Sequence, residues 1–162
     1  MKNEYLHEVV ITAIVRNKDK YLIIRRSKNK KRFPGMWTVP GGRLDVKDYL
    51  AFPKDTKFYW YNVLEKTLRR EVKEEVGIEI KNVEYLTSLA TVHKDGSPSL
   101  VISCIANYLS GEIILQKAET DKFVWVTVDE AKKYHLIDGI YDELVLADKK
   151  FNGIKEEWKR NS

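Results

Sequence analysis

The chain has 162 residues, of which 43% are hydrophobic, and its formal net charge is +5 at neutral pH. This length predicts one domain, and the hydrophobic content is sufficient for a buried core. No apolar run is long enough to span a bilayer, and the first residues lack the apolar stretch of a signal peptide. The one cysteine, Cys104, excludes an internal disulfide, so we expect a cytoplasmic protein that does not enter membranes.

Positive and negative residues are mixed along the chain, except in the basic run at residues 27–32. Such a run is typical of a solvated loop, and the alternative is an attractive field for a polyphosphate. No zinc-knuckle, RNP or helix-turn-helix pattern accompanies it. We therefore expect no nucleic-acid partner.

Segments rich in apolar and β-branched residues predict strands along most of the chain. They span residues 8–16, 21–26, 36–39, 83–93, 99–109, 112–115 and 122–126. The turn at 17–20 makes the first two strands antiparallel, and the turn at 94–97 joins the two longest in a hairpin. Thr127 and Glu130 have the spacing of a capping box at a helix start, and residues 141–150 predict the last helix.

Strands interleaved with two or three helices predict an α/β or α+β fold, with a central mixed sheet covered by helices. The chain contains no internal repeat, low-complexity segment or linker. We expect a single domain over residues 1–155, followed by a polar tail at 156–162.

A helical pattern begins near Trp60 and ends at Gly77, a residue suited to the left-handed position after a helix. Its apolar residues recur every four positions, which predicts the face toward the core. They are Leu64, Leu68, Val72 and Val76. A neighbouring stripe of the same helix carries Glu71, Glu74 and Glu75.

These three carboxylates repel one another by roughly several tenths of a kcal/mol per pair at a surface. A divalent cation would turn that repulsion into attraction, and clustered carboxylate oxygens suit Mg²⁺ or Mn²⁺ better than Zn²⁺. A glutamate cluster on a helix is by itself most often solvated surface. Here the turn at Trp37–Gly42 and the arginine directly before the cluster favour a functional role.

The chain resembles the Nudix hydrolase family over residues 5–150. The sequence box of that family runs G-x5-E-x7-R-E-U-x-E-E-x-G-U, where U is aliphatic. Residues Arg70–Ile78 fit its closing half at every position, and Trp37–Gly42 is similar to its usual lead-in. The resemblance implies an α/β/α sandwich with a central mixed sheet.

The opening half of the box departs from the pattern. Its first glutamate should lie eight residues before the arginine, where this chain has Asn62. The residues between Gly42 and that position, 43–61, form a longer, aromatic-rich insertion. Asp45 or Asp48 could replace the glutamate, or nothing does. The insertion's aromatic residues could stack a base, although packing within the insertion is favoured.

The resemblance implies hydrolysis of a nucleoside diphosphate linked to another group, with Mg²⁺ or Mn²⁺ as cofactor. Glu71 and Glu75 are the expected first ligands, and Glu74 is a ligand or the group that deprotonates the water. Arg70 is expected to orient Glu71 through an ion pair. Glu119, on a later loop, is expected as a further ligand or base.

Further residues are expected at the substrate. Gly41 and Gly42 let the backbone approach the site without a side-chain clash. One of the two arginines that end the second strand could hold a phosphate, and we favour Arg26. Substrate choice is expected near the last helix, where Asp138 is a candidate. Asp121 is the second choice for the loop carboxylate.

Two alternatives remain from the sequence. A Nudix-like domain can bind a nucleotide or regulate without hydrolysis, although such a domain has no need for three repelling carboxylates. An isoprenyl diphosphate isomerase would need a reactive cysteine, and Cys104 lies in an apolar segment. The partner is expected to be a small nucleotide or diphosphate whose identity the sequence does not give, and the protein a monomer or homodimer.

Overall fold

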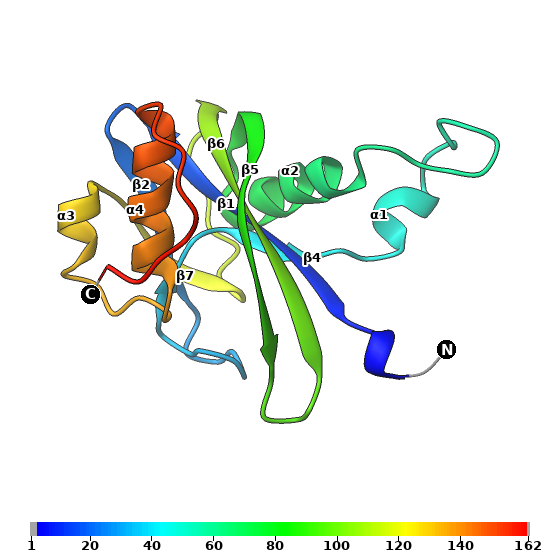
Figure 1. The fold of residues 1–162 in the computed structure, drawn as a ribbon, viewed down its shortest axis with the longest axis horizontal. Helices are drawn as coiled ribbons and strands as arrows, with labels where there is room; N and C mark the ends of the chain where they lie inside the picture. The colour runs from blue at the N-terminus through cyan, green and yellow to red at the C-terminus, as the bar shows by residue number, and fades with distance from the viewer. Residues whose placement is uncertain (1–2, 162) are drawn as a thin grey trace.

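A computed structural model describes residues 3–161, so the outermost residues of the predicted domain and tail lie outside it. Seven strands form one sheet, and helices lie on both of its faces (Figure 1). The strands are β1 (Glu8–Asn17), β2 (Lys20–Arg26), β3 (Trp37–Thr38), β4 (Gly41–Arg43), β5 (Glu79–Val92), β6 (Pro98–Ser110) and β7 (Thr120–Val126). The helices are the 3-10 turn Asn3–Tyr5, α1 (Lys47–Leu50), α2 (Val63–Val76), α3 (Val128–Ala131) and α4 (Ile140–Phe151).

Strand β1 organises the sheet. It runs parallel to β6 and antiparallel to both β2 and β4, which lie along its second and first halves. The strand order is β3-β2-β1-β6-β5, and β7 pairs antiparallel with β2 along the edge that faces away from β1 and β3. This confirms the predicted mixed sheet and the antiparallel pairing of the first two strands. The predicted strand at 36–39 is shorter, and the two glycines after Pro40 form part of β4.

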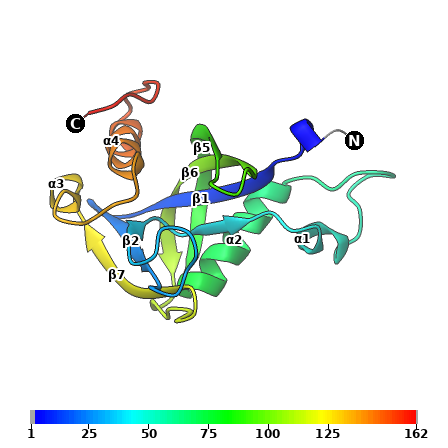
Figure 2. The ribbon, with the colours of Figure 1, turned by 90° about the horizontal axis from the view of Figure 1, so that it is seen from below.

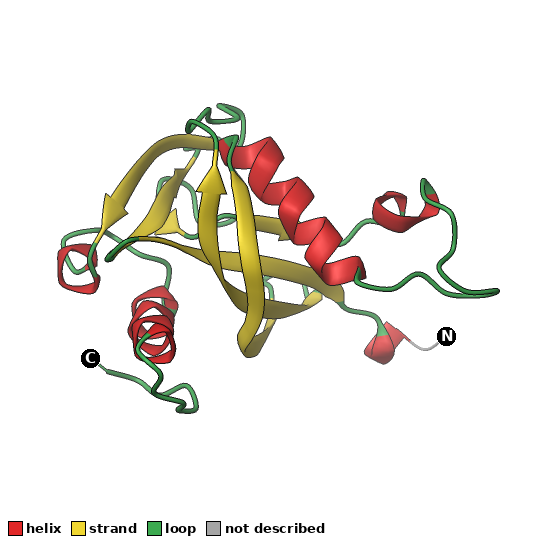
Figure 3. Cartoon of the chain, turned by 90° about the horizontal axis from the view of Figure 1, so that it is seen from above, coloured by secondary structure: helices red, strands yellow, loops and turns green. Residues whose placement is uncertain are grey.

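The sheet is buried on both faces, which makes its inner strands continuously apolar. On one face, Ile11 and Val15 of β1 share a core with Leu68 and Val72 of α2. On the other face, Ile14 packs in a second core, which includes residues of α3 and α4. Figures 2 and 3 show α2 and α4 on opposite sides of the sheet, so the predicted α/β/α sandwich is confirmed.

The structure confirms the predicted end of α2 and the predicted start of α3. Gly77 ends α2 in the left-handed conformation, with φ of 80°. Thr127 caps α3 in a complete capping box with Glu130. No helix within residues 3–161 is both long and apolar enough to cross a membrane.

The predicted strand at 112–115 is wrong. Its amides turn toward the end of α2, where the last carbonyls of a helix need donors. Ile114 donates its backbone N–H to the carbonyl of Val76 at 3.0 Å, and Gln116 donates to that of Glu75 at 2.9 Å. This irregular segment therefore fixes the end of α2 that carries the glutamates.

Candidate active site

The apolar face of α2 determines where its glutamates point. Leu68, Val72 and Val76 are fully buried against the sheet, so the next stripe of the helix meets the short strand β4. Gly41 of β4 donates its backbone N–H to Glu75 Oε2 at 3.1 Å. A glutamate on the surface of α2 is thus fixed against a strand of the sheet.

Gly42 is required by the position of Glu71. A Cβ atom at residue 42 would overlap the carboxylate of Glu71, which lies directly over the glycine backbone. At Gly41 the same addition would strike the backbone of Ile11 and Thr12. The two glycines therefore let β4 lie between β1 and the helix, in the close approach expected from the sequence.

Glu75 is the most strongly perturbed of the three carboxyl groups. Burial raises its pKa from 4.5 to about 7, against the opposing effect of its hydrogen bonds. One of these comes from Gly41, and Thr120 Oγ1 donates the other to Glu75 Oε1 at 2.9 Å. Glu75 therefore changes its charge near neutral pH when no cation is present. Burial also raises the pKa of Glu71, and Arg70 opposes that rise.

Arg70 joins three carboxylates. Its Nη2 donates to Glu71 Oε1 and its Nη1 to Glu74 Oε2, both at 2.8 Å. Its Nε lies 2.5 Å from Asp48 Oδ1 in an ion pair. The resemblance implied the contact with Glu71. The arginine in addition ties the helix to the start of the insertion.

Asp48, a predicted substitute for the missing glutamate, lies beside the arginine of the box. Its side chain is 5% exposed, and it accepts hydrogen bonds from the Asp45 N–H at 2.8 Å and from Thr67 Oγ1 at 3.2 Å. Burial opposes its ionisation, but these bonds and Arg70 lower its pKa below the usual value. Of the two predicted substitutes, Asp48 contacts Arg70, whereas Asp45 has an exposed side chain.

The sequence contained a signal for this assignment. Counted forward from Gly42, five residues separate it from Asp48, which is the spacing of the family's opening glutamate. Counted backward from Arg70, the same position falls on Asn62. The extra residues therefore lie between Asp48 and the helix, and the opening of the box is intact except for one methylene.

Arg26 lies near both Glu75 and Glu119. Burial lowers the pKa of Arg26, and the negative charges of Glu75 and Glu119 oppose the change. The amine of Lys30 contacts the Glu119 carboxylate, which connects the basic loop to the loop before β7. The second-choice residue, Asp121, instead accepts hydrogen bonds from Nε and Nη2 of Arg25, at 2.7 and 2.8 Å.

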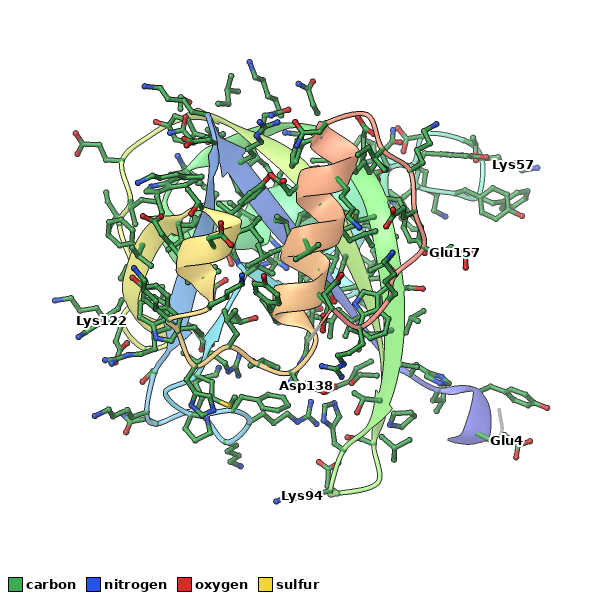
Figure 4. All side chains as sticks on the ribbon, turned by 60° about the vertical axis from the view of Figure 1, so that its left-hand side comes forward. Glu4, Lys57, Lys94, Lys122, Asp138 and Glu157 are labelled. Atoms are coloured by element: carbon green, nitrogen blue, oxygen red, sulfur yellow. The ribbon has the colours of Figure 1, made fainter. Side chains whose placement is uncertain are left out.

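Asp138 lies apart from these residues. It precedes α4, on the opposite face of the sheet from α2 (Figure 4). Its carboxylate is 84% exposed and pairs with Arg160 of the tail, at 2.7 Å. The structure does not bring Asp138 to the acidic stripe, and its role in substrate choice stays a prediction.

The donor chemistry of the stripe fits a hard divalent cation, because every candidate ligand is a carboxylate. Arg70 holds one oxygen of Glu71 and one of Glu74, and no partner is found within residues 3–161 for Glu71 Oε2 or Glu74 Oε1. In this arrangement, three such side chains do not converge on one point anywhere in the described part of the chain. Glu71 Oε2 and Glu74 Oε1 are therefore the oxygens open to a cation while Arg70 holds the other oxygen of each side chain.

A family model described as the NUDIX domain matches residues 6–145 of the chain. The chain belongs to the NUDIX family. Among curated relatives, a NAD-capped RNA hydrolase NudC from Mannheimia succiniciproducens is 33% identical over 122 residues. That alignment covers 75% of this chain but only 39% of the NudC protein.

Two further NUDIX proteins resemble the chain over most of their own length. A nucleoside triphosphatase NudI from Klebsiella pneumoniae is 23% identical, and the alignment covers 80% of this chain and 89% of NudI. The crystal structure of a MutT NUDIX hydrolase from Burkholderia pseudomallei superposes with a TM-score of 0.69 at 20% identity. It covers 87% of this chain and 98% of that protein, which shows the shared fold.

Proposed function

We propose that this NUDIX protein hydrolyses a phosphoanhydride bond in a nucleoside diphosphate linked to another group, with Mg²⁺ or Mn²⁺ as cofactor. One observation carries the proposal. Arg70 and the two glycines of β4 hold Glu71, Glu74 and Glu75 as a group beside an open surface. Three carboxylates kept close together, with one pKa raised to about 7, are a costly arrangement without a cation to bind.

Glu71, Glu74 and Glu75 would hold the metal ions. When bound, such ions neutralise phosphate oxygens and lower the pKa of coordinated water. Arg70 keeps Glu71 and Glu74 near their working positions, and Asp48 keeps Arg70 in place.

The remaining roles concern the water and the phosphates. Glu74 is the best candidate to orient and deprotonate the attacking water, because its side chain is 55% exposed and only one oxygen is held. Glu119 is the second candidate, once Lys30 releases it. Arg26 is the proposed contact for a phosphate, since its charge lies close to the same carboxylates.

A small nucleotide is the proposed substrate. The alignment covers nearly all of NudI, whose name specifies a nucleoside triphosphatase, and less than half of NudC. Nucleoside triphosphates are therefore the first compounds to test, followed by NAD and ADP-ribose.

The test measures phosphate and nucleotide products with Mg²⁺ or Mn²⁺ over this panel. We expect turnover by the wild type, and a loss of at least a thousandfold in Glu74→Gln and Glu75→Gln with the fold retained. Glu65→Gln is the matched control, because Glu65 is an exposed glutamate of the same helix outside the stripe. Equal product release by the wild type and both stripe variants would rule the proposal out.

The same panel separates the alternatives. Nucleotide binding that needs no metal and gives no product would favour a binding domain. The isomerase alternative needs a reactive thiol, whereas Cys104 is 5% exposed in the core and burial raises its pKa to about 11. We expect Cys104→Ala to keep its hydrolytic activity.

A further inference from the structure

The insertion between Asp48 and α2 builds one wall of a groove that begins at the acidic stripe. The groove has a volume of about 860 Å³, within the range of ligand sites. Val46, Ala51 and Phe52 line it on the insertion side, and Glu71 and Glu74 line it on the helix side. Figure 1 shows α1 and the loop after it standing clear of the sheet, beside α2.

The apolar side chains of the groove are unusually exposed for hydrophobic residues. Val46 is 53% exposed and Phe52 is 55% exposed, although each lies a short distance from a charged stripe. Exposed apolar groups gathered beside a reactive centre are typical of a ligand surface. The groove therefore has one face for a charged diphosphate and one for an apolar group.

The apolar wall is held in place by its backbone. Trp60 Nε1 donates a hydrogen bond to the Phe52 carbonyl at 2.9 Å, and the Trp60 ring packs on Tyr49 with 5.3 Å between centroids. At the start of the insertion, the buried Asp48 is fixed by Arg70. The backbone that carries Phe52 is therefore fixed beside the groove before a ligand binds.

The groove carries charges of both signs: Arg70 and the carboxylates of Asp45, Asp48, Glu71 and Glu74 lie on its walls, and three further cations lie at its rim. Arg43, Lys47 and Lys66 also line it, and all three are exposed. Arg43 lies 3.4 Å from Glu8 and Lys66 lies 3.9 Å from Asp55, which are weak surface contacts. Cations at the rim can attract phosphates, while Phe52 supplies a face for stacking.

We propose that this groove is a subsite for a planar aromatic ring attached to one end of the diphosphate substrate, with Phe52 as its stacking residue. The proposal rests on the proposed function for the diphosphate at Glu71 and Glu74. The further claim is that the insertion selects substrates in which a ring is attached to the diphosphate and extends from it along α2. A nucleobase and a nicotinamide share this chemistry.

The test measures binding in a background that cannot turn over. In Glu75→Gln protein with Mg²⁺, calorimetry gives the affinities for NAD, ADP-ribose and inorganic pyrophosphate. We expect Phe52→Ala to weaken the ring-bearing ligands by about five- to hundredfold, the range for loss of a stacked base, and to leave pyrophosphate unchanged. Phe52→Trp should retain the affinity. A loss for NAD alone assigns the second ring of NAD to the groove, and a loss for both compounds assigns adenine.

Phe58→Ala is the matched control. Phe58 belongs to the same insertion and is 61% exposed, but it does not line the groove. Equal weakening by Phe52→Ala and Phe58→Ala would overturn the proposal, as would an equal loss for pyrophosphate or no loss at all. Failure of every ring-bearing compound to bind would also overturn it. If these ligands bind as expected but the wild-type protein with Mg²⁺ releases no product from them, the hydrolase function alone is disproved.

Discussion

Helix α2 and the insertion before it are attached to the protein in different ways. The helix buries Leu68, Val72 and Val76 completely, and backbone bonds from the segment after Gly111 hold its last carbonyls. The insertion buries little of its apolar surface, because Phe52 and Phe58 are more than half exposed. The contacts of Asp48 and Trp60 fix it instead.

This difference separates two tasks. Groups that act on a reacting bond must be positioned closely, and a packed helix on a sheet does that better than a loop. Groups that choose the substrate tolerate variation in length and sequence, which loops supply. A change in either attachment should therefore reveal whether chemistry or stability depends on it.

The largest expected effect is on the free energy of unfolding, which is lowered when the poorly solvated Glu75 carboxyl group is charged. Because its folded pKa is about 7 and its unfolded value is 4.5, the stability from its neutral form is present below pH 4.5 and lost as the pH rises through 7. Glu75→Gln avoids this loss and can keep the bonds to Gly41 and Thr120. In metal-free protein at pH 8, we expect it to raise the free energy of unfolding by roughly 3 kcal/mol.

Urea unfolding with a chelator present at pH 5 and pH 8 measures this gain. It should shrink toward pH 5, where the wild-type carboxyl is already neutral in the folded protein. Glu65→Gln, an exposed change on the same helix, should show no such dependence. Equal stability of the Glu75 variant and the wild type at pH 8 would mean that Glu75 carries no burial cost.

The next effect tests the close contact between β4 and the helix. Gly42→Ala places a methyl group where the Glu71 carboxylate lies, so Glu71 must move. A displacement of about 1 Å can cost roughly a hundredfold in rate, and we expect kcat to fall by that amount. Gly96→Ala is the control, because nothing lies within 4 Å of the added atom. It should lower stability through its positive φ of 81° and leave kcat unchanged. An unchanged kcat in Gly42→Ala would show that the position of Glu71 is not critical.

The packed parts of the molecule were readable from the sequence because their signals are local. The four-residue spacing of Leu64, Leu68 and Val72 predicted α2, and the residue type of Gly77 predicted its end. The run of apolar and β-branched residues at 8–16 predicted β1, which spans Glu8–Asn17. The acidic stripe followed from helical spacing, whereas the contacts of Glu71 and Glu75 with the two glycines came from the structure.

The parts that depend on contacts between distant residues were not readable. Spacing from Gly42 points to Asp48, but the contacts with Arg70 and Thr67 that distinguish it from Asp45 require the path of the insertion. The 112–115 segment has a short apolar run typical of a strand, but the open carbonyls at the end of α2 compete for the backbone donors of this region. The exposure of Phe52 likewise depends on which residues the insertion covers, and periodicity does not determine that.

A smaller effect is expected from the link between the two regions. Asp48→Asn removes the charge opposite Arg70 but keeps the shape of a buried side chain. We expect unfolding to become easier by about 1–3 kcal/mol, and kcat to fall about tenfold because Arg70 then holds Glu71 less firmly. Chemical denaturation and initial rates measure the two losses. Asp45→Asn, which changes an exposed carboxylate, should lose less in both; equal losses would disprove the anchoring role of Asp48.

The smallest effect is expected at the loop carboxylate. Glu119 is 43% exposed and touches Lys30, and an exposed ion pair contributes roughly 0–1 kcal/mol to stability. If Glu119 assists as a base, Glu119→Gln should lower kcat by up to about tenfold, with little change in the free energy of unfolding. Lys30→Ala removes the partner of Glu119 and should change kcat by less than about threefold. Asp121→Asn provides the comparison, because Asp121 is a carboxylate of the same region held by Arg25 instead. Initial rates across pH 6–9 distinguish the two residues. A larger rate loss in Asp121→Asn than in Glu119→Gln would make Asp121 the loop carboxylate that assists the reaction. The reacting groups would then lie beside Arg25 rather than beside Glu75.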